Sequence, residues 1–352
     1  MWTALGAVLV SWFPLFLLSA AQGLAFGKET PIPFVLDFGV SVRFLIAVPL
    51  LILAETGIDR SIAIAVDNFL QSGLVQEDEL SSFEAVIERI TRLRDRILPE
   101  AVILVLAYLP SFFLFSSEIL MTSASSWRFV EQQTLSRAEW WFGLFSMPVY
   151  RFLLLQWVWR ACLWAFFLWR VSKLNLVLIP IHPDRAGGIG FLADAQSSFW
   201  LIAVAGGVVV AGELGNGIAY HGVTVNEALL TIACYCVIAT LALISPLLLL
   251  TPKLLRVKEQ GLLEYGALAS IYTQTLDVKL AYCGASEGEA LLGSLELRSL
   301  ADLRTVFALV ERMRVVPIDK RTLIRLAFAV VLPIALLLFL ATPHFIRTVL
   351  AF

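Results

Sequence analysis

Charged residues are scarce in this chain: Asp, Glu, Lys and Arg make up 15% of its 352 residues, whereas soluble globular chains average ~25%. Apolar residues make up 59%, and the mean hydropathy is +0.84. Because the apolar residues gather in long runs, the composition indicates an integral membrane protein. The net charge of −2 gives no basic field that would attract nucleic acid, so we expect the lipid bilayer, and no nucleic acid, as a partner.

Cysteine and histidine are also few, with four of the first and three of the second. The cysteines have neither the spacing of a disulfide framework nor that of a zinc site. They are Cys162, Cys234, Cys236 and Cys283. No motif for a bound cofactor accompanies them, so we expect no metal and no cofactor.

Seven apolar stretches are long enough to cross the ~30 Å hydrocarbon core, which takes ~20 helical residues. They cover roughly residues 3–26, 33–54, 98–121, 141–171, 199–219, 227–251 and 322–350. No Lys or Arg precedes the first stretch, so we interpret it as an uncleaved span rather than a signal peptide. Since backbone groups in lipid must bond internally, the sequence predicts an all-α integral membrane protein with about seven transmembrane helices and a small helical cytoplasmic domain.

The positions of Lys and Arg predict the orientation. Nineteen of the 26 basic residues fall between the spans on one side, and only Lys28, Arg128, Arg137 and Arg347 fall on the other. Basic residues are enriched on the cytoplasmic side of a membrane. We therefore expect a cytoplasmic N-terminus and a periplasmic C-terminus.

This orientation divides the chain into alternating parts. Two spans lie in each of 1–54, 98–171 and 199–251, and the last span lies in 322–352. The cytoplasmic parts are the amphipathic region 55–97, the loop 172–198 and the helical segment 252–321.

Two of the cytoplasmic parts carry apolar stripes at helical spacing. The stripes are Leu80, Phe83, Ile87, Ile90 and Ile97, and then Leu300, Leu303, Phe307 and Val310. Ser299, with Asp302 three residues on, predicts an N-terminal cap for the second helix. Residues 254–275 predict a helix that continues the sixth span. These helices are expected either to bury one another's stripes in one domain or to lie along the membrane surface.

Two arginines fall near the middle of predicted spans. Arg43 and Arg151 are each ten residues from the outer end of their helix, or ~15 Å deep at ~1.5 Å per residue. No acid is evident at the same depth in the sequence. One hypothesis is therefore an anion-binding cavity lined by both arginines. The alternative is structural: one arginine reaches Asp37 or Glu118, or both cap backbone carbonyls.

The most unusual stretch is LIPIHPDRAGGIGFL, residues 178–192. The HPD tripeptide also occurs in J-domains, but the membrane-like helix before it and the glycines after it exclude that interpretation. A phosphate-binding loop lacks its lysine, a metal site lacks further ligands, and acid–base chemistry by His182 and Asp184 lacks a nucleophile. We favour a rigid turn in which Asp184 bonds nearby amides and the glycines supply positive φ or close approach. The motif residues are His182, Asp184, Arg185, Gly187, Gly188 and Gly190.

Two motifs together carry a resemblance to a known group of proteins. HPDRAGGIGFL, and SLADL…ERMRVVP over residues 299–317, resemble those of a family of uncharacterised bacterial inner-membrane proteins. The resemblance covers about thirty residues, and it implies location and architecture but no activity.

Three functions follow as hypotheses. The first is a channel or transporter for a small anionic solute, based on Arg43 and Arg151. The second is a membrane scaffold or sensory subunit, whose cytoplasmic helices bind a protein partner or a second copy. The third is an interfacial enzyme that uses His182 and Asp184. Of these, the enzyme has the least support, so we assign no catalytic residue.

Overall fold

The computed structural model describes residues 2–26, 30–116, 126–130, 134–282 and 295–340, and these are largely helical. The first half contains α1 (Trp2–Ser11), α2 (Phe13–Ala21), the short 3-10 turn η1 (Phe34–Leu36), α3 (Phe38–Val42), the π-helical turn η2 (Arg43–Ala47), α4 (Val48–Gln71), α5 (Glu77–Arg94) and α6 (Ile97–Ser116). A two-residue antiparallel ribbon follows, β1 (Phe129–Val130) with β2 (Thr134–Leu135). The second half contains α7 (Arg137–Trp141), the π-helical turn η4 (Phe142–Ser146), α8 (Met147–Val171), α9 (Phe191–Ser197), α10 (Trp200–Tyr220), α11 (Val225–Leu248), α12 (Thr251–Tyr282), α14 (Leu295–Glu311) and α15 (Lys320–Leu340).

Five helical stretches among the described residues are long and apolar enough to cross a membrane. They are Thr3–Ala21, Phe38–Gln71, Arg137–Val171, Phe191–Tyr220 and Asn226–Leu248. A shorter apolar helix covers Ile97–Phe112. The all-α membrane class is therefore confirmed, while the full number of seven spans stays a prediction.

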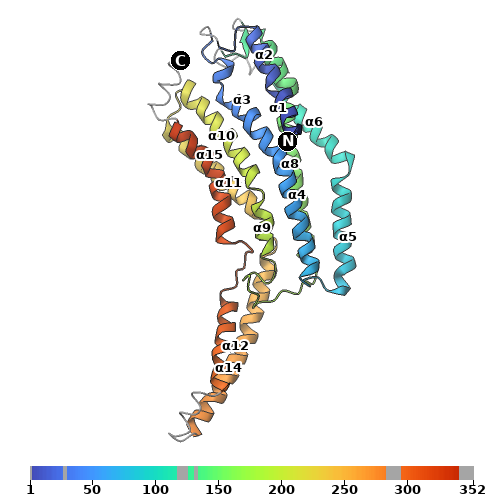
Figure 1. Ribbon diagram of the computed structural model, residues 1–352, viewed down its shortest axis with the longest axis vertical. Coiled ribbons are helices and arrows are strands. Elements are labelled where there is room, and N and C mark those ends of the chain that lie inside the picture. Colours follow the sequence, from blue (N-terminus) through green and yellow to red (C-terminus); the bar gives the residue numbers. More distant parts are fainter. Residues whose placement is uncertain (1, 27–29, 117–125, 131–133, 283–294, 341–352) are drawn as a thin grey trace.

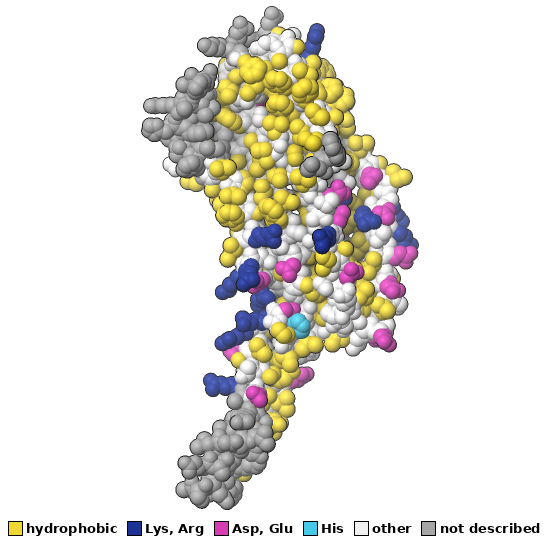
Figure 2. Space-filling view, viewed as in Figure 1, with side chains coloured by type: hydrophobic (Ala, Val, Ile, Leu, Met, Phe, Trp, Pro, Cys, Tyr) yellow, Lys and Arg dark blue, Asp and Glu magenta, His cyan; other side chains and the backbone are white. Residues whose placement is uncertain are grey.

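The helices form an elongated bundle with one projection (Figure 1). The long helices α4, α8 and α10 run along the bundle, and α5 stands at its side. Beyond one end of the bundle, α12 and α14 lie against each other as a hairpin. Hydrophobic side chains cover the upper part of the visible face, whereas charged side chains gather around α5 and the base of the hairpin (Figure 2). The apolar zone is the part that lipid would surround.

The helix α10 lies close to its neighbours because glycines face them. A Cβ at Gly207 would lie 3.0 Å from the carbonyl oxygen of Val330 in α15. On the other side of α10, a Cβ at Gly212 would collide with Val42 in α3. Small residues let helix backbones approach closely where lipid supplies no hydrophobic driving force between them.

The first amphipathic helix is confirmed as α5, although its stripe is shorter than predicted. Phe83 is fully buried, with its ring 5.8 Å from that of Phe69 and 6.1 Å from that of Phe167. Ile97, by contrast, opens α6 and is 80% exposed. The helix α4, which precedes α5, runs to Gln71, well past the expected end of the span at residue 54.

The helix predicted over 254–275 is also confirmed, as part of α12. The predicted cap at Ser299 is wrong, because α14 already begins at Leu295. The Leu-Glu-Leu-Arg residues before Ser299 are all good helix formers, and they extend the helix backwards. The two stripes are not buried together: α5 packs on α8, whereas α14 packs on α12.

We expect the Phe83→Ala substitution to loosen α5 from the bundle. Emptying a fully buried Phe site costs ~3–5 kcal/mol of unfolding free energy. The loss of stability should lower the unfolding temperature in detergent. It should also speed trypsin cleavage at the arginines of α5. Leu80→Ala is the control, since Leu80 is 38% exposed on the same helix; equal effects of the two substitutions would contradict this packing.

Candidate functional site

The carboxylate of Asp184 organises the unusual loop, and we call residues 178–192 the elbow. Its Oδ1 accepts hydrogen bonds from the amides of Ala186 (2.8 Å) and Gly188 (3.2 Å). Its Oδ2 accepts one from the amide of Gly190 at 2.8 Å. One side chain thus fixes three amides of the turn, in the way the sequence predicts for a structural aspartate.

The backbone of the elbow needs its glycines. Gly187 and Gly188 have φ of +68° and +98°, values that side chains rarely tolerate. Gly190 has ordinary φ, but a Cβ there would lie 2.9 Å from Oδ2 of Asp184. Arg185 also adopts a positive φ, +55°, which costs conformational energy that the surrounding bonds must offset. Its side chain is exposed.

Arg314 ties the elbow to the second motif. Its Nη2 donates to the carbonyl oxygen of Asp184 at 2.7 Å, and its backbone N–H donates to the carbonyl oxygen of Arg185 at 2.7 Å. Its Nη1 donates to the carbonyl oxygen of Ile318 at 2.7 Å and contacts a carboxylate oxygen of Asp319 at 3.1 Å. The two sequence motifs are therefore in direct contact, across 130 residues of chain.

An apolar cluster supports this junction from beneath. A Cβ at Gly187 would lie 3.2 Å from Cε of Met313 and 3.3 Å from Cδ2 of Leu254. Met313 is 2% exposed and Leu254 is fully buried. Lys258 of α12 also donates to the carbonyl oxygen of Met313 at 2.8 Å. The base of the hairpin and the elbow therefore pack as one unit.

His182 forms a further polar contact within the elbow. Its Nδ1 lies 2.8 Å from Oδ1 of Asp184, and its side chain is 41% exposed. Burial acts to raise the pKa of Asp184, but the hydrogen bonds from Ala186, Gly190, His182 and Gly188 together hold that pKa below its usual value. The carboxylate thus bonds the amides of the turn, and His182 is the more exposed member of the pair. No cluster of three or more metal-ligating side chains occurs among the described residues.

The two intramembrane arginines have separate partners. Arg43 pairs with Glu213 of α10, and it also contacts Sδ of Met147 at 3.5 Å and the ring of Tyr150 at 5.5 Å. Arg151 donates to the hydroxyl of Ser111 in α6 at 2.8 Å. The expectation that no acid lies at the depth of Arg43 is therefore wrong. Glu213 lies 170 residues away in the chain, so only the packing of α10 on α3 and η2 brings it near.

Asp37 forms no ion pair with an arginine among the residues that the structure describes. Its carboxylate instead accepts hydrogen bonds from the amide of Val40 at 3.0 Å, from Nε1 of Trp127 at 2.9 Å and from Nδ2 of Asn216 at 2.8 Å. It thereby caps α3 and ties it to α10. Glu118, the other predicted partner, lies outside the described residues.

Comparisons with known proteins add no assignment: no family model, curated protein or solved structure matches the chain.

The elbow predicts a pH-dependent effect of Asp184→Asn. A carboxyl whose pKa is lower in the folded state stabilises the fold above its unfolded pKa of ~3.9 and loses that contribution as pH falls through its folded value. At pH 7 the substitution should cost ~1.5–3 kcal/mol for hydrogen bonds to a charged acceptor. Scanning fluorimetry should show that the Tm difference between the variant and the native protein shrinks as the pH falls below ~3.9. Asp194→Asn, at an exposed position of α9, is the control; a difference independent of pH would contradict a stabilising carboxylate.

The Arg43–Glu213 pair predicts non-additive substitutions. Glu213→Gln leaves the guanidinium of Arg43, which is only 10% exposed, without its counter-charge. Adding Arg43→Gln should therefore recover stability, with a coupling of at least ~1 kcal/mol in a double-mutant cycle. The same cycle between Glu213→Gln and Arg151→Gln should be additive. Additivity in both cycles would mean that the Arg43–Glu213 ion pair contributes nothing to the free energy of unfolding.

Proposed function

We propose that the protein is a membrane-anchored scaffold or sensory subunit whose α12–α14 hairpin binds a cytoplasmic protein partner. The observation that carries this proposal is the contact of Arg314 with the backbone of Asp184 and Arg185. The hairpin extends beyond the bundle (Figure 1), yet its base is bonded to the loop between α8 and α9. A projection held at a fixed angle suits the presentation of a surface to another protein.

The exposed side of α12 has the chemistry of a docking surface. Leu263, Ile271 and Val278 are 75%, 59% and 58% exposed. Their spacings of eight and seven residues place them on one side of a helix, within roughly 80°. An apolar row of this kind is matched by an amphipathic helix, which buries its own apolar face in the contact. A helix from a second protein is therefore the partner that we propose, with a second copy of this chain as the alternative.

The location follows from the same proposal. The concentration of Lys and Arg in α5, the elbow and the hairpin supports a cytoplasmic location for these parts. The resemblance of the two motifs to bacterial inner-membrane proteins supports that membrane. In this orientation the N-terminus is cytoplasmic and the C-terminus periplasmic.

The anion pathway through Arg43 and Arg151 is the alternative function. We favour the scaffold because both guanidinium groups already have partners within the protein, Glu213 and Ser111. The interfacial enzyme has less support still, because the carboxylate of Asp184 is bonded to three backbone amides.

The partner can be sought by photo-crosslinking in intact cells. A benzoylphenylalanine at position 271 should form an adduct of defined mass, because the apolar row lies in the contact. The control places the same group at Thr273, which is exposed and roughly 200° away around the helix.

An adduct from position 271 that contains a different protein supports the proposal. An adduct of twice the chain's own mass supports the self-association alternative instead. Equal adducts from both positions, or adducts with lipid alone, would contradict a docking role for this row.

A further inference from the structure

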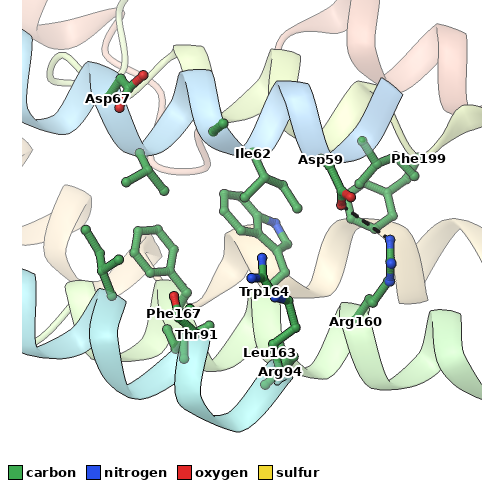
Figure 3. Close-up of a pocket in the computed structure, with 15 residues that line it drawn as sticks. Asp59, Ile62, Asp67, Thr91, Arg94, Arg160, Leu163, Trp164, Phe167 and Phe199 are labelled. Atoms are coloured by element: carbon green, nitrogen blue, oxygen red, sulfur yellow. Dashed lines mark hydrogen bonds and ion pairs between the residues drawn. The ribbon is translucent and has the colours of Figure 1, made fainter. Parts of the chain in front are cut away.

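A pocket lies between α4, α5 and α8, separate from both the elbow and the intramembrane arginines. Its volume is about 480 Å³, within the ~300–1,000 Å³ of small-molecule sites. Most of its lining is apolar, including Ile62, Val66, Ile87 and Ile90. Figure 3 shows these helices enclosing it, with Phe167 and Trp164 on one side and Ile62 on the other.

The aromatic wall of the pocket is held rigidly in place. The rings of Trp164 and Phe167 stack at 5.5 Å with 19° between their planes. Nε1 of Trp164 donates to the side-chain oxygen of Gln196 at 3.0 Å, and Gln196 is 2% exposed. A wall fixed in this way needs no ordering when an apolar ligand binds.

One end of the pocket is charged, and its two arginines differ. Arg160 is engaged with the carboxylates of Asp59, at 3.3 Å, and Glu55. Arg94 reaches from α5 toward Trp164 (Figure 3). Its Nε is bonded to Asp95 at 2.8 Å, but its terminal nitrogens form no hydrogen bond with any residue that the structure describes. Arg94 therefore shares its charge with Asp95, while its terminal nitrogens offer unused donors at the mouth of an apolar pocket.

The acids that line the pocket form no hydrogen bond with these donors. Asp59 is bonded to Arg160. Asp67 lies at the opposite end of the pocket in Figure 3, eight residues or ~12 Å along α4. Neither acid bonds to Arg94.

The charged end also lies where amphiphiles gather. Arg94 ends α5, and the apolar helix α6 begins three residues later at Ile97. Ile97 and Leu98 are 80% and 71% exposed, as residues that enter lipid would be. The mouth of the pocket is therefore next to the membrane boundary.

We propose that this pocket binds a single-chain anionic amphiphile, with its apolar chain against Trp164 and Phe167 and its carboxylate or phosphate at Arg94. The volume suits one chain rather than a complete two-chain phospholipid. The proposal is independent of the protein partner of the hairpin.

The test uses two photoreactive probes in membranes that contain the full chain: a fatty acid with a diazirine at its chain end, and the matching alkyl phosphate. The uncharged alcohol of the same chain length is the reference. Mass spectrometry of the labelled peptides should place the label on the pocket-lining parts of α4, α5 and α8. At least one anionic probe should label them about fivefold more than the alcohol does, as expected for one charge-assisted contact. The better anionic probe identifies the head group.

Matched variants separate the pocket from its surroundings. Arg94→Gln should reduce anionic labelling to the level of the alcohol, and Arg94→Lys should retain most of it. Arg92→Gln, at an exposed arginine paired with Glu88 on the same helix, should change nothing. Ile62→Trp should fill the pocket and remove all labelling there, whereas Ile64→Trp, at a position that is 50% exposed, should not.

Pocket labelling that survives both Arg94→Gln and Ile62→Trp would overturn the proposal. So would labelling by the anionic probes that is spread evenly over the exposed side of α6. Thermal unfolding of Ile62→Trp is measured in parallel. If it is normal, the loss of labelling in this variant comes from filling the pocket rather than from misfolding.

Discussion

The bonds around the carboxylate of Asp184 are the constraint on which the junction of this protein depends. Three amides converge on that carboxylate, and their bonds hold Arg185, Gly187 and Gly188 at positive φ. That conformation presents the backbone oxygens of Asp184 and Arg185 to Arg314. The membrane bundle and the hairpin are thereby bonded through backbone atoms as well as through side chains. A junction of this kind restricts rotation more than apolar packing alone does, because hydrogen bonds are directional.

Charged side chains within the bundle are likewise bonded to other groups of the protein. Inside the apolar zone, Arg43 has Glu213, Asp37 has three donors, and Arg151 has the hydroxyl of Ser111, so each of these groups is bonded within the protein. Near the edge of that zone the balance changes, because Arg94 keeps unused donors beside the pocket. The unused donors of Arg94 therefore lie where water and amphiphiles can reach them, whereas the bonded groups of Arg43 and Asp37 lie deeper. This difference is why we assign ligand binding to the pocket rather than to the midplane arginines.

Local chemistry predicted much of the elbow, and long-range contacts could not be predicted in the same way. The turn chemistry of Asp184 and of Gly190 depends on residues within six positions, and that part is confirmed. The partner of Arg43 is 170 residues away, and no spacing rule identifies it. Ser299 does not cap α14, because the helix formers before it extend the helix back to Leu295. The pocket was missed since its walls come from three helices, each of which shows only an ordinary apolar pattern.

The fixed hairpin is the central claim, and a distance between spin labels tests it most directly. With the native cysteines replaced, labels at Gln71 in α4 and Glu264 in α12 measure the position of the hairpin relative to the bundle. We predict one narrow distance distribution for the native sequence and for Arg312→Gln, and a broad one for Arg314→Gln. A distribution that is broad in the native sequence, or equally narrow in Arg314→Gln, would contradict the claim that Arg314 and the elbow hold the hairpin in place.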